Sequence, residues 1–175
     1  WKLSSSVIES SAVSETSTFR VMTSARCHTA DVRLVTLLGS TGSIGTQAID
    51  VVERRPDDFR VVAIAAGGGR PQLLAAQAAR LEVAAVGVAD PAAADAVRAE
   101  LDAAGVHAEL VVGPDAASQI ARWSSDVVLN GMDGAAGLGP TLSALKAGRV
   151  LALANKESLI IGGPLVTAAA GPGQI

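Results

Sequence analysis

The stretch LLGSTGSIGTQAIDVV, residues 37–52, joins an apolar run to a helix-like pattern through three evenly spaced glycines. Gly39, Gly42 and Gly45 would allow a sharp backbone turn and a close approach to a pyrophosphate. A helix that begins at this turn would present free N–H groups and its positive dipole end to a phosphate. The spacing is a variant of the dinucleotide-binding pattern G-x-G-x-x-G, and a plain strand–helix turn is the alternative interpretation.

Short apolar runs alternate with alanine-rich helical stretches along the rest of the chain. Runs of Val, Leu and Ala are typical of strands buried on both faces, and the stretches between them predict covering helices. The pattern therefore predicts an α/β fold with a doubly wound, mostly parallel sheet, Rossmann-like in its arrangement. In the first helix we expect Ile44, Ala48, Val51 and Val52 on one face. Strands are expected at 33–38, 60–66, 83–88, 108–113, 126–130 and 149–154, and helices at 43–55, 71–81, 90–105, 115–123 and 140–148.

Composition and charge argue against several classes of partner. The chain has 175 residues, is 49% hydrophobic and carries a formal charge of -3, with both signs interspersed. The charges form no basic face of the kind that would indicate nucleic-acid binding. No apolar run reaches the roughly 18 residues of a membrane helix. The single cysteine, Cys27, excludes an internal disulfide and indicates a reducing compartment, which favours a cytoplasmic location.

Residues 1–30 differ in character from the rest of the chain. They are rich in Ser and Thr and lack a sustained hydrophobic period. We interpret them as a disordered or spurious leader that is not part of the predicted fold. A plastid transit peptide is the other interpretation, but such peptides are poor in acids, and Glu9 and Glu15 lie in this segment.

The end of the second predicted strand bears on the choice of cofactor. NAD-binding folds commonly place a carboxylate there to hold the ribose 2′-hydroxyl. This chain instead reads AIAAGGGR at 63–70, with no carboxylate from Val61 to Arg70. Gly67–Gly69 leave room, and Arg70 adds positive charge, for a 2′-phosphate. We therefore expect NADP(H); the alternatives are a flexible glycine loop and a solvated arginine at a helix start.

A second polar group follows the last predicted strand. Asn155, Lys156 and Glu157 place an amide, a cation and a carboxylate at the edge of the sheet where ligands collect. Such a group suits an anionic substrate beside a nicotinamide. The alternative is that these residues only begin a helix.

Four stretches, taken in order and spacing, carry a resemblance to a known family. They are GSTGSIG, RPDDFRVVAIAAGG, GAAGLGPTLSALKAGR and LALANKESLIIGG. From about residue 32 to 175 the chain closely resembles the amino-terminal part of the 1-deoxy-D-xylulose 5-phosphate reductoisomerases. The resemblance implies an oxidoreductase that uses NADPH and a divalent metal, Mn²⁺ or Mg²⁺. Its sugar-phosphate substrate would be isomerised and reduced to 2-C-methyl-D-erythritol 4-phosphate in non-mevalonate isoprenoid biosynthesis, and the full-length enzyme is expected to be a homodimer.

The resemblance also implies roles for individual residues. The substrate would contact Lys156, and Lys156 and Glu157 are the candidate catalytic residues. Many relatives have Gly-Lys-Asn where this chain has Gly67–Gly69, and Asp133 stands where they are commonly apolar or Thr. NADPH would be bound by Thr41, Gly42, Ser43, Ile44, Gly67, Gly68, Gly69, Asn155 and Glu157.

The resemblance predicts that this chain is a fragment. The family's metal-binding D-S-E motif would follow the segment that matches GPGQI, so no metal ligand is expected within these residues. We expect an NADPH-binding domain at 31–154, the start of a truncated catalytic domain at 155–175, an apolar surface around Leu159–Val166, and no turnover by the chain alone. The rival functions are another NADP-dependent sugar-phosphate or semialdehyde dehydrogenase and a non-catalytic NADPH-binding domain.

Overall fold

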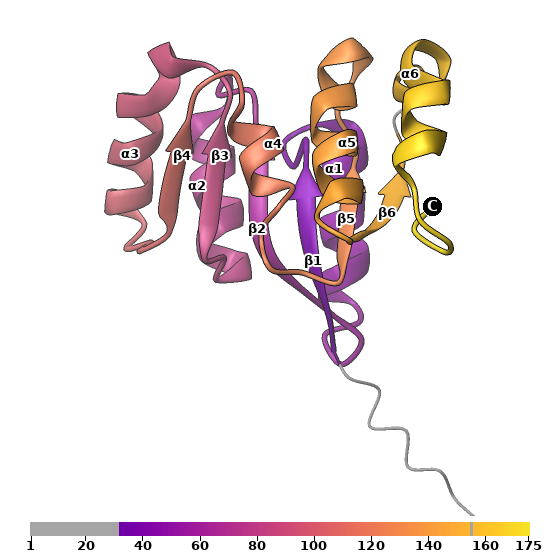
Figure 1. Cartoon of the computed structure of the whole chain (residues 1–175). Coiled ribbons are helices and arrows are strands. Elements are labelled where there is room, and N and C mark those ends of the chain that lie inside the picture. The colour runs from indigo at the N-terminus through magenta and orange to yellow at the C-terminus, as the bar shows by residue number, and fades with distance from the viewer. Residues whose placement is uncertain (1–31, 155) are drawn as a thin grey trace, which may run out of the picture.

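A computed structural model describes residues 32–154 and 156–175, and the predicted leader at 1–30 lies outside these residues. Its centre is a six-stranded, all-parallel sheet with the order β4-β3-β2-β1-β5-β6 (Figure 1). The doubly wound α/β fold expected from the sequence is thus confirmed. The strands are β1 (Arg33–Leu38), β2 (Phe59–Ala66), β3 (Ala85–Val88), β4 (Glu109–Val112), β5 (Val127–Asn130) and β6 (Val150–Leu153).

Helices cover both faces of the sheet. One buried cluster joins the strands to α1, α2 and α3, and a second joins them to α4, α5 and α6. Figure 1 shows α4 and α5 in front of the sheet and α1 and α2 behind it. The helices are α1 (Ser43–Glu53), α2 (Pro71–Leu81), α3 (Ala94–Ala103), α4 (Ala116–Ile120), α5 (Leu138–Lys146) and α6 (Lys156–Ala169), with 3₁₀ turns η1 (Pro91–Ala93) and η2 (Gly134–Gly137).

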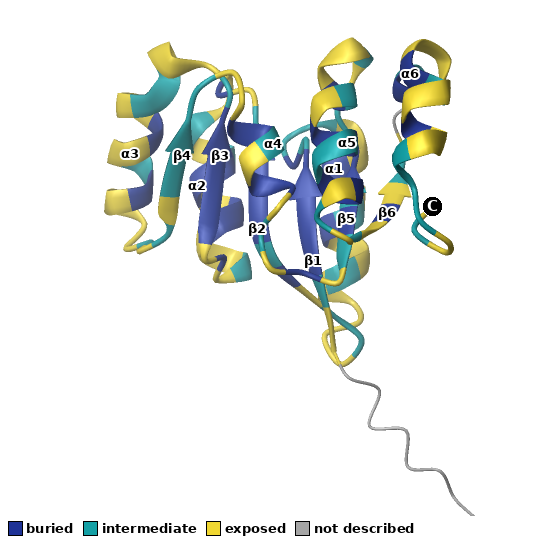
Figure 2. Cartoon of the chain, viewed as in Figure 1, coloured by how far each residue is buried: buried dark blue, intermediate teal, exposed yellow. Residues whose placement is uncertain are grey.

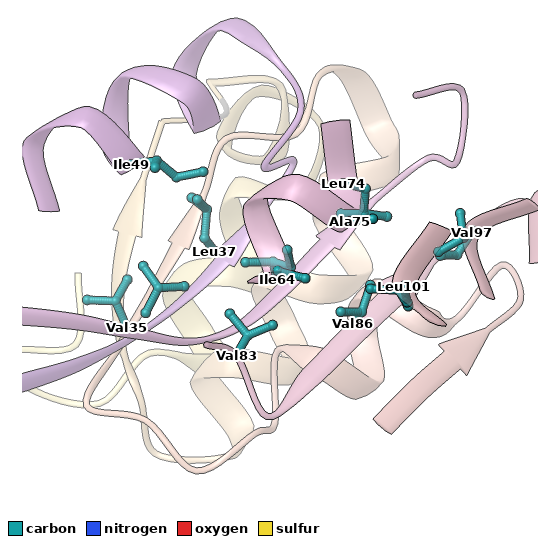
Figure 3. Close-up of a cluster of buried hydrophobic side chains, with 13 residues drawn as sticks. Val35, Leu37, Ile49, Ile64, Leu74, Ala75, Val83, Val86, Val97 and Leu101 are labelled. Carbon is teal, nitrogen blue, oxygen red and sulfur yellow. The ribbon is translucent and has the colours of Figure 1, made fainter. Parts of the chain in front are cut away.

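The continuous apolar strands supply both cores because successive side chains point to opposite faces. Leu37 joins the cluster beneath α1 and α2, whereas Leu38 joins the cluster beneath α4 and α5. Figure 3 shows Leu37 and Ile64 from the sheet, with Ile49 of α1 and Leu74 of α2, in the first cluster. In Figure 2 the central strands are largely buried and most exposed residues lie on the outer helix faces and loops.

The sheet order reverses at β1. From β1 the chain moves outward through β2, β3 and β4, and then crosses back to β5 on the other side of β1. Ligands of doubly wound sheets bind in the crevice beyond the carboxyl ends of the two strands at such a switch point. The segments that start at Gly39 and Gly131 follow these two strands.

Several helices differ from the sequence expectation. The α4 helix, expected at 115–123, spans only Ala116–Ile120, and α3, expected from residue 90, begins at Ala94 after the 3₁₀ turn η1. On α1 the buried residues are Gly45 and Ile49, whereas Ile44 and Val51 are 38% and 52% exposed. Of the four residues expected on one face, Ala48 and Val52 pack against the first cluster, whereas Ile44 and Val51 do not. The α5 helix begins at Leu138 rather than Pro140, since proline is tolerated within the first turn.

Residues 156–175 pack on the edge of the sheet. Val166 of α6 is fully buried in the second cluster. The Gln174 side chain donates to the carbonyl oxygens of Leu145 and Arg149, and the backbone carbonyl oxygen of Gln174 accepts from the Leu151 amide at 2.6 Å. The division into domains at 154/155 stays a prediction. Among the helices of the described residues, none combines the length and apolar character that crossing a membrane requires.

Candidate dinucleotide-binding site

A cavity of about 300 Å³ lies at the switch point of the sheet. Its walls come from the loops after β1, β2, β3 and β5, together with the start of α4. Most of the lining residues are Gly or Ala, so the cavity presents backbone atoms and methyl groups to a ligand. They are Gly39, Thr41, Gly42, Ala65, Ala66, Gly67, Ala89, Ala117, Gly131, Met132, Asp133 and Ala136.

The glycine loop is packed so closely that side chains would not fit. Gly39 has φ +80°, and a Cβ on it would lie 2.8 Å from the carbonyl oxygen of Gly131. A Cβ on Gly45 would collide with the Gly39 carbonyl and the Ser40 backbone. The first glycine thus brings β1 and β5 together, and the third lets α1 approach the turn.

The amino terminus of α1 is uncapped. Gly42 is the N-cap residue, and no side chain accepts a hydrogen bond from the first turn. Among the described residues, the N–H groups of Ser43, Ile44 and Gly45 donate to no acceptor. The first turn also contains no acidic residue. These free N–H groups and the helix dipole favour an anion at this position.

A buried glutamine forms a hydrogen bond to the glycine loop. Gln77 of α2 is 2% exposed, and its Nε2 donates to the Ser40 carbonyl at 2.9 Å. The amides of Gly39 and Ser40 in turn donate to the Ala65 carbonyl of β2 at 2.8 and 3.0 Å. The loop is therefore fixed from two elements before any ligand binds.

A buried asparagine shapes the opposite wall. Asn130 ends β5 and is fully buried. Its Nδ2 donates at 2.9 Å to both the Gly137 carbonyl and the Thr141 hydroxyl, and its Oδ1 accepts from the Met132 amide at 3.1 Å. This satisfied polar group ties the loop after β5 to α5.

The loop after β2 depends on glycine at one position. Gly68 is buried with φ +110°, and a Cβ there would lie 2.6 Å from the Cβ of Ala93. A residue with a side chain would not fit this loop conformation. Gly67 and Gly69 have open space around them. Arg70 ends the loop, and its Nη1 donates to the Thr41 carbonyl at 3.3 Å.

The residues after β6 lie apart from the cavity lining. Lys156 and Glu157 begin α6 and form an ion pair at 3.2 Å. The pKa of Glu157 lies below its ordinary value of 4.5 because its own backbone N–H and then the Lys156 ammonium stabilise the carboxylate. Asn155 lies outside the described residues.

Five of the predicted cofactor-binding residues either line the cavity or lie in the first turn of α1. Thr41, Gly42 and Gly67 line the cavity, and exposed Ser43 and Ile44 form the first turn of α1 beside it. Asp133, whose sequence position had no explanation, also lines the cavity and is exposed. In the described part of the chain, no group of three or more His, Cys, Asp or Glu could hold a metal ion.

Comparison with known proteins identifies the family. A family model described as 1-deoxy-D-xylulose 5-phosphate reductoisomerase matches residues 35–163. The chain belongs to this family. The resemblance expected from the sequence is thereby confirmed.

Curated relatives of the reductoisomerase family are similar but longer. The chain is 57% identical over 145 residues to the reductoisomerase of Streptomyces coelicolor, covering 81% of this chain and 35% of that protein. It is 58% identical over 142 residues to that of Mycolicibacterium smegmatis, covering 81% and 33%. The chain thus spans about a third of the length of these relatives.

Solved reductoisomerase structures share the fold. The enzyme from Zymomonas mobilis in complex with NADPH aligns with a TM-score of 0.73 and 38% identity, over 79% of this chain and 36% of that one. A second reductoisomerase, in complex with NADPH, fosmidomycin and magnesium, aligns with a TM-score of 0.76 and 30% identity, over 82% and 35%.

Sequence reasoning missed three residues that shape the site. Gly131 admits the Ile44 side chain, because a Cβ there would lie 2.9 Å from Ile44 Cγ2. A polar residue followed by glycine at the end of a buried strand was the available signal for Asn130 and Gly131. Gln77 gave a weaker signal, a polar residue within an otherwise apolar helix face.

Proposed function

We propose that this chain is the cofactor-binding part of an NADPH-dependent 1-deoxy-D-xylulose 5-phosphate reductoisomerase. The observation that carries the proposal is the backbone-lined cavity at the switch point, closed on one side by the uncapped start of α1. Backbone N–H groups can bind a diphosphate there without competition from a capping side chain or from an acid in the first turn of α1. Relatives at 57–58% identity bear the reductoisomerase name.

The whole enzyme would isomerise 1-deoxy-D-xylulose 5-phosphate and reduce it to 2-C-methyl-D-erythritol 4-phosphate for isoprenoid biosynthesis. When bound, NADPH supplies the hydride for the reduction. The part of this chain is to bind and orient that cofactor. We assign the diphosphate to Thr41, Gly42, Ser43 and Ile44, the adenosine ribose to Gly67, Gly68 and Gly69, the nicotinamide side to Asn155 and Glu157, and the substrate to Lys156.

Electrostatics after β6 suits an anionic substrate. The Lys156 side chain is 79% exposed, so its ammonium can reach a sugar phosphate. Glu157 stays ionised near neutral pH because its pKa lies below the ordinary value. Its charge would keep Lys156 directed along the start of α6.

A divalent metal, Mg²⁺ or Mn²⁺, belongs to the proposal only through the whole enzyme. One solved relative carries magnesium in its complex. The described residues here offer no three-ligand cluster that fits such an ion. We also propose that the whole enzyme is a homodimer, as the family resemblance implies, and that it is cytoplasmic, which the bacterial origin of the relatives supports.

A domain exchange tests the proposal. Residues 35–163 would replace the matching segment of the Streptomyces coelicolor relative, and NADPH oxidation would be measured with 1-deoxy-D-xylulose 5-phosphate and Mg²⁺. We expect turnover, lost in the Lys156→Ala chimera and retained in the Lys146→Ala chimera, since Lys146 lies on the exposed end of α5. A folded chimera that binds no NADPH would contradict the proposal. A chimera that binds NADPH but reduces only another sugar phosphate or a semialdehyde would support the rival dehydrogenase.

A further inference from the structure

We propose that Arg70 recognises the 2′-phosphate of NADPH and sets the preference for NADPH over NADH. The inference rests on the proposed function above, because it assigns a role to a residue beside the same cavity. It concerns a specificity residue of this chain, at the point where the loop after β2 meets α2.

Arg70 joins the two loops between which the adenosine end of a dinucleotide would lie. Its Nη1 donates to the Thr41 carbonyl of the glycine loop at 3.3 Å. Thr41 and Gly67, three residues before Arg70, both line the cavity. This hydrogen bond ties the exposed guanidinium to the glycine loop, whose residue Thr41 lines the cavity.

The guanidinium has donors to spare. Arginine carries five N–H donors, and Arg70 uses one of them among the described residues. Within those same residues, no carboxylate forms an ion pair with it, although Arg54, Arg55 and Arg80 all have such partners. An exposed arginine that is anchored but unpaired can bind a phosphate through two parallel hydrogen bonds.

The surroundings of Arg70 accept a phosphate and offer no competing acid on the same loop. Gly67 and Gly69 have no side chain and no neighbouring atom within 4 Å of a Cβ position. The strand and loop from Val61 to Arg70 contain no carboxylate to hold a free ribose 2′-hydroxyl. Asp90 of the adjacent loop accepts from the Ala92 amide at 2.9 Å, so its carboxylate caps η1.

The test compares ligands that differ only in the 2′-phosphate. Dissociation constants for NADPH and NADH, and for adenosine 2′,5′-bisphosphate and AMP, would be measured on the wild-type chain, Arg70→Ala and Arg70→Lys. Arg60→Ala is the matched control, because exposed Arg60 lies near the opposite end of β2 and its loss changes the net charge equally. Thermal unfolding checks that each variant is folded. If Arg70→Ala is not folded, Arg70→Lys takes its place as the test variant.

Arg70→Ala should raise the dissociation constants of NADPH and adenosine 2′,5′-bisphosphate by about 10- to 100-fold, because a charge-assisted hydrogen bond is lost. The dissociation constants of NADH and AMP should change by less than about twofold in Arg70→Ala. Arg60→Ala should leave all four dissociation constants unchanged. Arg70→Lys should retain part of the preference for NADPH, since lysine keeps the positive charge but cannot form the two parallel hydrogen bonds of a guanidinium.

Two results would overturn the inference alone. The wild type could prefer NADPH while Arg70→Ala keeps that preference, or Arg70→Ala could weaken NADPH and NADH equally, which would assign Arg70 to the glycine loop. A wild-type chain that binds neither dinucleotide would contradict the proposed function, and the inference with it.

Discussion

Replacement of Gly39 by alanine should destabilise the fold and damage the cavity together. The residue has φ +80°, a region that alanine enters at a cost of about 1–2 kcal/mol. The new Cβ would lie 2.8 Å from the Gly131 carbonyl oxygen and 3.0 Å from the Met132 amide nitrogen. Both contacts are with backbone, which cannot rotate away, and overpacking of this kind costs about 1–3 kcal/mol.

The two contributions together predict a loss of about 2–5 kcal/mol in the free energy of unfolding. That is a large part of the 5–15 kcal/mol typical of a domain. Urea unfolding followed by circular dichroism measures the loss, and an NADPH titration of the folded variant measures damage to the site. The variant should bind NADPH more weakly even where it remains folded, because β1 and β5 must separate at the cavity.

Gly69→Ala is the matched control. It lies on the neighbouring loop, its φ is outside the left-handed region and no atom lies within 4 Å of the Cβ position. Its stability should stay within about 1 kcal/mol of wild type, on the stabilising side, because alanine restricts the unfolded chain. If Gly39→Ala unfolds at the same urea concentration as Gly69→Ala, the close packing of the two loops described here is wrong.

Three further predictions concern the rest of the structure. Asn130→Ala should cost about 2–4 kcal/mol in urea unfolding, because it removes a buried side chain with three hydrogen bonds; a loss below about 1 kcal/mol would contradict its role. An NMR titration should find Glu157 ionised until the pH falls below 4.5. Its lowered pKa means that any stability it adds is present above the ordinary value and lost as pH falls through the folded-state pKa; a midpoint above 4.5 would refute this. Val166→Ala should cost about 2 kcal/mol, whereas Ile160→Ala, at a site 74% exposed, should cost almost nothing; equal costs would contradict the packing of α6.

The fold was largely predictable because its signals are local and repeated. Each buried strand reads as an apolar run, and the predicted helix at 71–81 matches α2 at both ends, where Pro71 can begin a helix and Glu82 ends it in the left-handed region. The strand order follows from the rule of right-handed crossovers rather than from any single residue.

The site was predictable only where backbone geometry requires a residue type. Gly39 and Gly45 stand where no side chain fits, so the glycine spacing alone indicated the loop. The roles of Gln77 and Asn130 arise from contacts between residues 37 and 11 positions apart, which no local pattern reveals. The exposure of Ile44 and Val51 depends in the same way on how α1 packs against the sheet, which no local pattern reveals.

The apolar surface expected around Leu159–Val166 is present in part. Ile160, Ile161 and Leu165 are 74%, 58% and 60% exposed, while Gly162 and Val166 are buried against the fold. Helical periodicity explains the division, because Gly162 and Val166 lie four residues apart on the face that packs on α5.

Mapping of NADPH onto the chain by amide chemical-shift perturbation tests the central claim most directly. We predict that the largest shifts fall in residues 39–45, 67–70 and 131–133, around the cavity at the switch point. Shifts concentrated instead in the groove between α4 and α5, around Ser118, Arg122 and Lys146, would contradict the account, as would the absence of any saturable shift.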